Sequence, residues 1–374
     1  MGGELARAGA DFPEERFLRD LLRAWDAAQR GAPGESALAA APPALDWDHF
    51  LALVRRHGVA YPARAGLSRI GEGAVPPDVA RVLDQILVQV RSTNVLMFDR
   101  LRRVAARLEA AGVPFLVLKG PALVGLLYRD PAARPMTDLD LLIRRSDLSR
   151  ALAALEEGGL EVPSGGERRF WERSYHHIVV RMGRDLPVQI ELHWDLELRE
   201  RYPFPLEEIW ARSTSFPLGD ARLKTLALED HYLFGAIHLA RHFYAPRLVW
   251  LVDQRRMARE WSLDWGAIAR RAAVVRARTP LWFVATYEER IFGDSALPPA
   301  VRPLPRPLQR RLLQWASGPR PLEPLRDVER ESRRIFVTLL FFDRLTDLAR
   351  FLFIHWRRKA AKWSGLERLM RSRE

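Results

Sequence analysis

The chain contains 374 residues, more than a single domain usually holds. Its hydrophobic fraction of 48% and charged fraction of 28% are typical of globular proteins and exclude disorder and fibrous repeats. The absence of cysteine excludes disulfides, a thiol nucleophile and thiolate metal sites. The net charge of +12, to which only four lysines contribute, leaves nucleotide, nucleic acid and an anionic membrane surface open as partners.

The first third of the chain carries helical patterns. No apolar run reaches the roughly 18 residues of a membrane span, and the first residues lack the features of a signal peptide, which favours a cytoplasmic protein. Asp46 opens a periodic segment that extends through His57. A longer helix is predicted from about Pro77 to Ala111, where Gly112 ends it.

Residues 112 to about 220 mix strand and helix patterns. Short helices are predicted over 123–128 and up to Glu157, the second with Ser146 or Asp147 as its N-cap. The last two strands are joined by a predicted hairpin turn at 182–185. The predicted strands cover residues 115–118, 138–143, 175–181 and 188–194.

Helical periods return after residue 224. The predicted helices cover 226–243, 248–261 and 280–292. The proline-rich stretch 298–324 predicts extended or turn structure, and the segment 330–373 is apolar on one side and increasingly basic. We therefore predict an α+β protein with helical regions at 1–111 and 225–374 around a mixed α/β unit at 112–224.

The strand at 138–143 carries the clearest chemical pattern. Side chains alternate between the two faces of a strand, so Asp138 and Asp140 share one face while Leu139, Leu141 and Ile143 face the core. Two neighbouring carboxylates repel each other unless a cation lies between them, and oxygen ligands suit Mg²⁺ or Mn²⁺. An isolated Asp-x-Asp pair is equally typical of a solvated strand face.

A second polar strand face follows in the predicted hairpin. Gln189, Glu191 and His193 alternate with apolar residues, and Glu191 is a candidate third carboxylate. The order of elements adds to this pattern: a strand that ends at a glycine, a short helix, Asp-x-Asp on a strand, and a later strand with a carboxylate. This order resembles the nucleotidyltransferase fold of the DNA polymerase β superfamily.

More specifically, the chain resembles the uncharacterised nucleotidyltransferase family of the NTP transferase 5 type. The similarity is expected to extend from the N-terminal helices to about residue 260 and to make residues 112–224 the nucleotidyltransferase domain. The matching residues are Leu118-Lys119-Gly120, Tyr128, Arg134, Asp138-Leu139-Asp140, Glu191-Leu192-His193-Trp194, His238, Arg247-Leu248 and Trp250-Leu251-Val252-Asp253.

The resemblance implies phosphoryl transfer at a metal site. Asp138 and Asp140 would bridge Mg²⁺ or Mn²⁺ ions, and Glu191 would bind the ion on the acceptor side. Gly120 would form the phosphate turn, although Pro121 after it has no N–H to offer a phosphate.

Charged and imidazole side chains complete the predicted nucleotide site. Lys119 and Arg134 would replace the missing phosphate contacts, and their alternative is a surface ion pair. His193 would contact the nucleotide or the acceptor, or else bind a neighbouring carboxylate. A weaker rival chemistry is zinc binding by His238 and His242, which are spaced i, i+4, with Asp253, although a packing role is favoured for this pair.

These features predict a metal-dependent enzyme that transfers a nucleoside monophosphate from a nucleoside triphosphate to an unidentified small molecule, sugar or peptide. A role in natural-product or polysaccharide tailoring is implied by the resemblance. The alternatives are a catalytically degenerate binding or scaffold protein and, by superfamily analogy alone, a toxin or antitoxin component. The basic segment from Phe351 to Glu374 is compatible with peripheral contact with an anionic membrane, but a helix that packs on the domain through its tryptophans is favoured.

Overall fold

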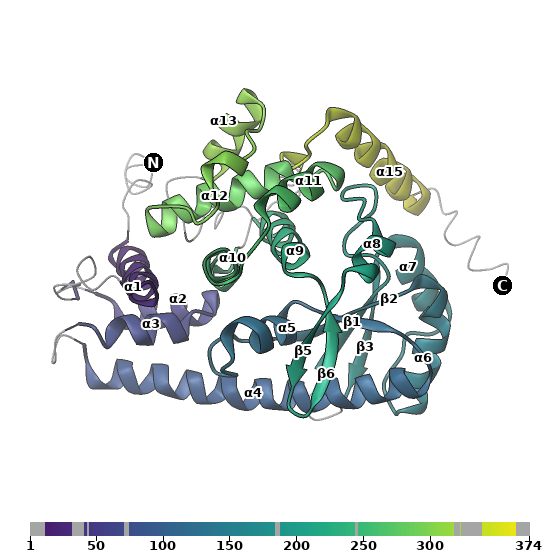
Figure 1. Cartoon of the computed structure of the whole chain (residues 1–374), viewed down its shortest axis with the longest axis horizontal. Helices are drawn as coiled ribbons and strands as arrows, with labels where there is room; N and C mark the ends of the chain where they lie inside the picture. Colours follow the sequence, from purple (N-terminus) through teal and green to yellow (C-terminus); the bar gives the residue numbers. More distant parts are fainter. Residues whose placement is uncertain are drawn as a thin grey trace.

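The structure is a computed structural model that describes residues 12–31, 41–42, 45–70, 75–183, 188–243, 246–317, 322 and 339–363. Within these residues a mixed sheet of six strands is surrounded by helices, which confirms the α+β prediction (Figure 1). The predicted long helix is α4 (Pro77–Ala110), which runs along one side of the sheet.

The sheet has the strand order β3-β4-β2-β1-β6-β5. The central strand β2 pairs antiparallel with β1 and parallel with β4. Strands β3 and β4 form the predicted antiparallel hairpin, whose turn lies partly outside the described residues. The strands are β1 (Phe115–Leu118), β2 (Asp138–Ile143), β3 (His177–Met182), β4 (Val188–His193), β5 (Thr214–Leu218) and β6 (Ala221–Thr225).

One face of the sheet packs on the second half of α4 and on α6 (Leu148–Glu157). Because strand side chains alternate, the odd-numbered residues of β2 and the even-numbered residues of β4 supply this apolar face. Burying them removes their apolar surface from water, which is the main stabilisation of this half of the molecule. The strand residues of this core include Val117, Leu139, Leu141, Ile143, Ile190 and Leu192.

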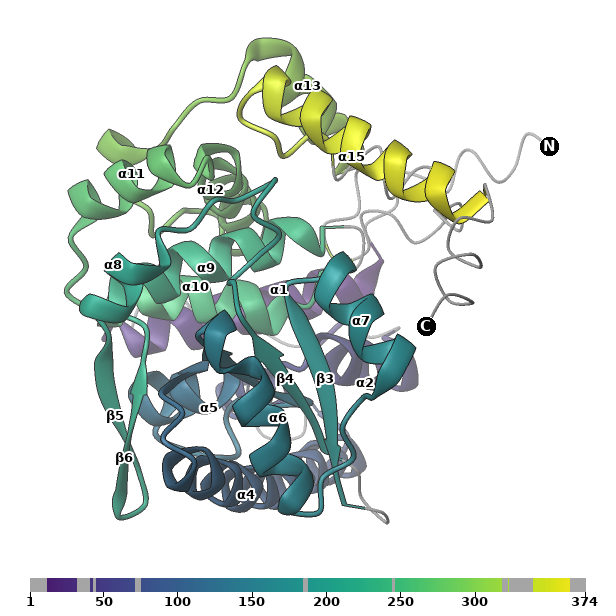
Figure 2. The same cartoon turned by 90° about the vertical axis from the view of Figure 1, so that its right-hand side faces the viewer.

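The opposite face of the sheet is covered by α9 (Leu228–Arg241) and α10 (Leu248–Glu260), which lie across the upper ends of β3 and β4 in Figure 2. Leu116, Leu118 and Leu142 face this side and join a second core. Its other members include residues of helices toward both ends of the chain, among them α1 (Pro13–Gln29), α2 (Trp47–His57), α3 (Ala60–Leu67) and α12 (Arg278–Phe292).

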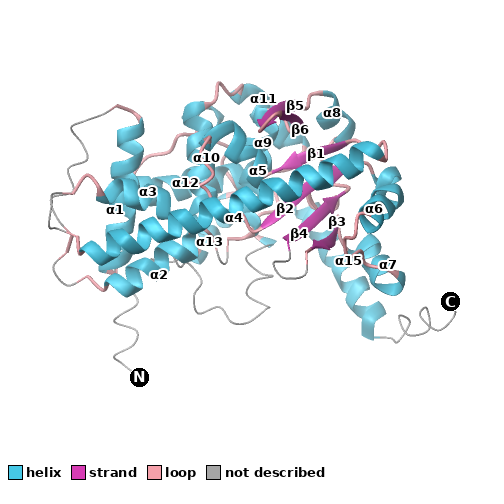
Figure 3. Ribbon diagram, turned by 90° about the horizontal axis from the view of Figure 1, so that it is seen from below, coloured by secondary structure: helices cyan, strands magenta, loops and turns pink. Residues whose placement is uncertain are grey.

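Helix α4 joins the two cores. Its first half buries Val79 and Leu83 with α1 to α3, while Leu101, Val104 and Leu108 in its second half pack under the sheet. Figure 3 shows the helix running from the N-terminal helices to the sheet. The N-terminal and C-terminal helices thus share one core, and the division into three regions stays a prediction.

Several elements differ from the sequence prediction. The stretch 298–324 contains helix α13 (Pro307–Ala316), so the expectation of extended structure is wrong there. Pro307 lies in the first turn, where a missing N–H costs nothing. Asp147 is the N-cap residue of α6, as predicted, but it also ends a 3₁₀ turn and its side chain caps no N–H. The pattern did not predict α3, α7 (Gly165–Ser174), α8 (Leu206–Ala211), α11 (Trp265–Val274), β5 and β6.

The C-terminal segment is helical over α15 (Leu345–Trp363). Trp356 is 65% exposed, so packing of the helix on the domain through this tryptophan is wrong. The structure does not describe the basic side chains beyond it, and membrane contact stays a prediction. Among the described residues no helix is both long enough and apolar enough to cross a bilayer.

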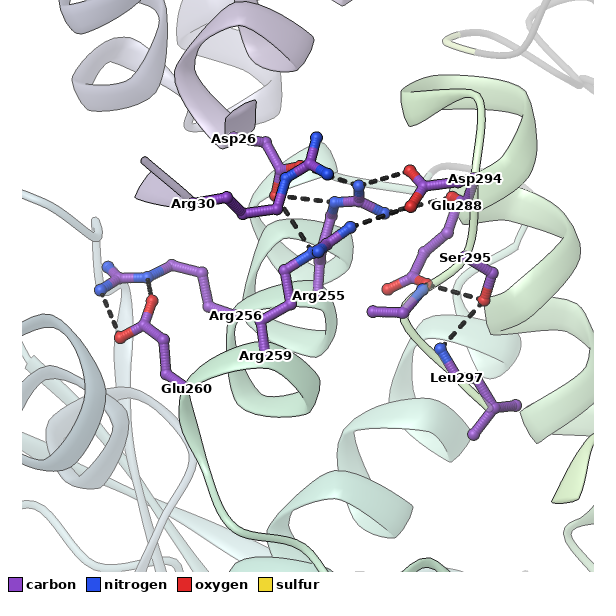
Figure 4. A network of polar contacts seen from close by, with 11 residues as sticks. Asp26, Arg30, Arg255, Arg256, Arg259, Glu260, Glu288, Asp294, Ser295 and Leu297 are labelled. Atoms are coloured by element: carbon purple, nitrogen blue, oxygen red, sulfur yellow. Dashed lines mark hydrogen bonds and ion pairs between the residues drawn. The ribbon is translucent and has the colours of Figure 1, made fainter. Parts of the chain in front are cut away.

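A buried ion-pair network ties the N-terminal helix α1 to α10 (Figure 4). The guanidinium group of Arg255 donates from Nε and Nη2 to the two carboxylate oxygens of Asp26, both at 2.8 Å. It also donates from Nη2 to Asp294 at 2.6 Å. A fully desolvated arginine needs such compensation, so this network fixes the position of α10 relative to the N-terminal helices.

Glu288 of α12, beside this network, is expected to make stability depend on pH. Burial raises its pKa from 4.5 to about 7, so the folded protein retains a proton that the unfolded chain loses above pH ~4.5. Stability therefore falls as pH rises through this interval, by about 3 kcal/mol at ~1.4 kcal/mol per unit. Urea unfolding at pH 5 and pH 8 should show this loss in the wild type and little of it in Glu288→Gln. Equal pH dependence in both proteins would contradict it.

Candidate active site

The two aspartates of β2 and the glutamate of β4 lie on the sheet face opposite α4. In the parallel pairing Asp140 is directly beside Glu191, and Asp138 is beside Gln189. Neighbouring residues in register point to the same face of a sheet. The structure therefore brings the three predicted carboxylates together, as the alternation of each strand and the pairing of the two strands require.

Lys119 follows β1 directly and reaches the central carboxylate. Its Nζ donates to Asp140 Oδ1 at 2.7 Å, and the two side chains are 21% and 1% exposed. Its backbone has φ 46°, a left-handed conformation that costs a non-glycine residue roughly 1–3 kcal/mol and is often found at functional sites. The alternative of a surface ion pair is wrong for Lys119, because Asp140 is buried.

Gly120 begins α5 (Gly120–Leu123), which continues as a π-helical turn to Tyr128. A Cβ atom at Gly120 would lie 3.0 Å from Met136 Sδ and 3.4 Å from Arg134 Nη1. The position therefore lacks room for a side chain. Its predicted role as a phosphate turn stays a prediction.

His193 lies at the end of β4 and contacts two of the carboxylates. Its Nε2 is 2.9 Å from Asp140 Oδ1 and 3.2 Å from Glu191 Oε2. The side chain is 2% exposed. In the structure, His193 therefore binds neighbouring carboxylates, which is one of its two predicted roles. Its contact with a nucleotide stays a prediction.

The carboxylates differ in their electrostatic environment. Burial and the charge of Asp140 raise the pKa of Asp138 to about 6. Burial also acts on Asp140, but the charge of Lys119 and the hydrogen bond with His193 outweigh it and lower the pKa. Burial opposes ionisation of Glu191, yet the hydrogen bond with His193 lowers its pKa. Asp138 is thus the carboxylate with the least compensation for its charge.

Arg134 precedes β2 and is bound to a helix that follows the sheet in the chain. Its guanidinium group contacts both carboxylate oxygens of Asp253 on α10, at 2.9–3.0 Å. Tyr128 Oη donates to the same carboxylate at 2.6 Å. Arg134 and Asp253 are 8% and 5% exposed, so the alternative of a surface ion pair is wrong here too.

Asn94 of α4 holds the loop that carries Arg134, a role the sequence pattern did not reveal. Its Nδ2 donates to the carbonyls of Pro131 and Arg134, at 2.6 and 2.7 Å, and its Oδ1 accepts from Met136 N at 3.3 Å. The side chain is fully buried. A lone polar residue facing the core in a long amphipathic helix is the only sequence signal that could have pointed to it.

A pocket of about 390 Å³ opens over these residues, a size suited to a small ligand. Asp140 lies beneath it, 1% exposed and covered by Lys119 and His193. The other predicted site residues line it: Lys119, Gly120, Arg134, Asp138, Glu191 and His193.

Arg247 also lines the pocket and was not among the predicted site residues. It makes no hydrogen bond or ion pair with any residue of the described ranges. Burial and the charge of Arg134 lower its pKa. A partly desolvated guanidinium without a carboxylate partner is costly, and an anionic ligand would compensate it.

His238 and His242 lie at the end of α9 and pack on Trp250, with ring centroids 4.7 and 5.1 Å from the tryptophan. Asp253 is bound to Arg134 and Tyr128 instead. Neither histidine belongs to a group of potential metal ligands within the described ranges. The alternative of a zinc site at this pair with Asp253 is therefore wrong, and packing accounts for the pair.

The donor set fits a divalent cation at the carboxylates. One potential ligand atom from each of Asp140, Glu191 and His193 lies within 4.8 Å of the others. Asp138 shares their face, and burial together with the charge of Asp140 raises its pKa. A set dominated by carboxylate oxygen suits Mg²⁺ or Mn²⁺.

Residues 43–293 match the family described as "Uncharacterised nucleotidyltransferase", and the chain belongs to this family. The match confirms the resemblance seen in the sequence. It extends beyond the expected limit near residue 260 and includes α12. No curated protein matches the chain.

Solved structures give weaker similarities. The antibiotic-resistance factor ANT(2'')-Ia in solution is 11% identical, with 53% of this chain and 98% of that chain covered and a TM-score of 0.35. A crystal structure of ANT(2")-Ia with adenylyl-2"-tobramycin is 14% identical, with 49% and 98% covered and a TM-score of 0.35. A nucleotidyltransferase-like protein from Paracoccidioides brasiliensis is 13% identical, with 58% and 96% covered and a TM-score of 0.34. Similarity of this degree assigns no residue role or substrate to this chain.

Proposed function

We propose that this chain transfers a nucleoside monophosphate from a nucleoside triphosphate to an acceptor, with Mg²⁺ or Mn²⁺ as cofactor. The observation that carries the proposal is the convergence of Asp138, Asp140 and Glu191 on one sheet face below a pocket. Family membership supports the reaction class. The acceptor hydroxyl would form a bond to the α-phosphorus while the bond to the β-phosphate breaks and pyrophosphate leaves.

Asp138, Asp140 and Glu191 would hold the cation, which supplies Lewis-acid activation of the triphosphate and neutralises the leaving pyrophosphate. His193 orients two of these carboxylates through its contacts at 2.9 and 3.2 Å. Lys119 neutralises Asp140 in the structure described here. With Asp140 as a metal ligand, the ammonium group of Lys119 would be available to the phosphates.

The basic side chains that we assign to phosphate binding are not the same as those in the sequence prediction. Asp253 already binds the guanidinium group of Arg134, so we assign Arg134 to holding the loop before β2. Arg247 lines the pocket and has no anionic partner among the described residues. Its planar fork matches the oxygens of a triphosphate. Lys119 and Arg247 are therefore the proposed phosphate contacts.

The second candidate function is a binding or scaffold protein that retains the fold. The ion pair between Lys119 and Asp140 favours it, because an internal ammonium group can substitute for a cation at the buried carboxylate. Pro121 has no N–H to bind a phosphate, which also favours the binding or scaffold protein. Asp138 and Glu191 are half-buried and line the pocket, which favours the enzyme.

Thermal unfolding with each of the four nucleoside triphosphates tests the proposal. A ligand that binds only the native state at one hundred times its Kd stabilises it by about 2.7 kcal/mol. We expect such a gain with Mg²⁺ and at least one triphosphate, and none with the metal chelated. Transfer of an α-³²P-labelled nucleotide to sugars, small molecules or peptides then identifies the acceptor. No gain with any triphosphate would favour the binding protein.

Replacing Arg247 with methionine should weaken binding of the triphosphate by about 1.5–3 kcal/mol, the range for a charge-assisted hydrogen bond. Binding of the nucleoside itself should not change, because the guanidinium group is assigned to the phosphates. Isothermal titration measures both affinities. Arg91→Met, at a side chain that is 60% exposed outside the pocket, is the control. Equal losses for the nucleoside and the triphosphate would contradict the assignment.

A further inference from the structure

Three histidines, His176, His177 and His193, cluster beside the carboxylates. The proposed reaction uses His193 to orient two carboxylates and gives no role to the other two. His177 of β3 is directly opposite His193 of β4, and His176 immediately precedes β3. Their exposed fractions are 4% for His176, 8% for His177 and 2% for His193. The ring centroids lie 4.8–5.5 Å apart.

Each of these rings has an unsatisfied nitrogen. The Nδ1 atoms of His176, His177 and His193 are buried and have no hydrogen-bond partner among the residues that the structure describes. A buried polar atom without a partner loses its hydration without compensation. Aromatic packing against Trp171 and Tyr175 accounts for the burial of His177 but leaves its nitrogen unsatisfied. A neutral imidazole in this condition offers a lone pair to a metal ion.

The environment of His193 is that of a metal-binding histidine. Its Nε2 lies against Asp140 Oδ1 at 2.9 Å, so a proton on Nε2 leaves the lone pair on Nδ1. A ligating histidine usually donates its other ring N–H to a carboxylate in this way. One ring nitrogen from each of the three histidines lies within 4.8 Å of the others.

We propose that His176, His177 and His193 bind one transition-metal ion of the Zn²⁺ class, at a site distinct from the Mg²⁺ or Mn²⁺ site of the carboxylates. Three neutral imidazoles suit Zn²⁺, Co²⁺ or Ni²⁺, whereas Mg²⁺ prefers oxygen ligands. All three residues line the pocket, so the coordination position that the histidines do not fill faces the ligand space. A water molecule or a donor atom of the acceptor would occupy it.

Titration of the metal-free full-length protein with Co²⁺ tests the site without nucleotide, so its outcome is independent of the proposed transfer reaction. We expect one equivalent to bind with the strong visible bands of a tetrahedral site, and Zn²⁺ to displace it. His176→Ala and His177→Ala should each lower Co²⁺ affinity by more than about tenfold. His238→Ala, at another histidine of the same pocket, is the matched control and should bind as the wild type does.

A second measurement uses only the wild type and therefore does not depend on the folding of the variants. X-ray absorption of the Zn²⁺-loaded protein should show three imidazole ligands. One imidazole with oxygen ligands would place the ion at Asp140, Glu191 and His193 and overturn the proposal. Stoichiometric binding that His176→Ala leaves unchanged, or no Co²⁺ binding by the wild type, would also overturn it.

Discussion

Replacing Asp140 with asparagine is expected to lower metal-dependent nucleotidyl transfer by more than about 100-fold. Loss of a residue that only supports a metal ligand already costs 10- to 100-fold, and Asp140 is the central carboxylate between Asp138 and Glu191. The stabilisation that Mg²⁺ and a triphosphate provide in thermal unfolding should disappear in the same variant. Both effects follow from the loss of one negative charge at an almost isosteric side chain.

The control for this variant is Asp147→Asn, which removes an aspartate paired with Arg150 outside the pocket. It should retain both the transfer activity and the metal-dependent stabilisation. Circular dichroism of Asp140→Asn without metal should match the wild type, because the amide oxygen still accepts hydrogen bonds. Full metal-dependent stabilisation in Asp140→Asn would remove this residue from the cation site.

Replacing Arg134 with alanine is expected to destabilise the protein by about 3–5 kcal/mol, since it leaves a buried carboxylate without its cation. Asp253 is 5% exposed and would retain the hydrogen bond from the hydroxyl of Tyr128. Urea unfolding measures the loss. The sequence alone predicts that Arg134 contacts the nucleotide, so that its replacement would weaken nucleotide binding.

Two further variants separate these alternatives. The double variant Arg134→Met with Asp253→Leu should recover most of the lost stability, because replacing a whole buried ion pair by apolar residues is often neutral. Arg64→Ala breaks the exposed pair with Asp84 and should cost no more than about 1 kcal/mol. An Arg134→Ala protein with wild-type stability and weakened triphosphate binding would restore the phosphate-binding assignment.

Some elements escaped the sequence prediction for identifiable reasons. Strands β5 and β6 have five residues each, so their alternation of buried and exposed side chains covers too few residues to stand out in the sequence. Helix α7 has a mostly polar sequence, and none of its residues is buried. Patterns of two or 3.6 residues are visible only where one face of an element is consistently buried.

The sequence by itself determined the α+β class, the long helix α4 and the side chains that share each strand face. These properties depend on local periodicity, which a few consecutive residues are enough to define. The tertiary structure alone decided which charges meet: Arg134 binds Asp253, 119 positions away, and Lys119 binds Asp140. An arginine can pair with any of the 47 acidic residues, and only the packing of α9 and α10 over the sheet selects the partner. The same packing leaves Arg247 in the pocket without an anionic partner in the described part of the chain, and it brings His176 and His177 beside His193.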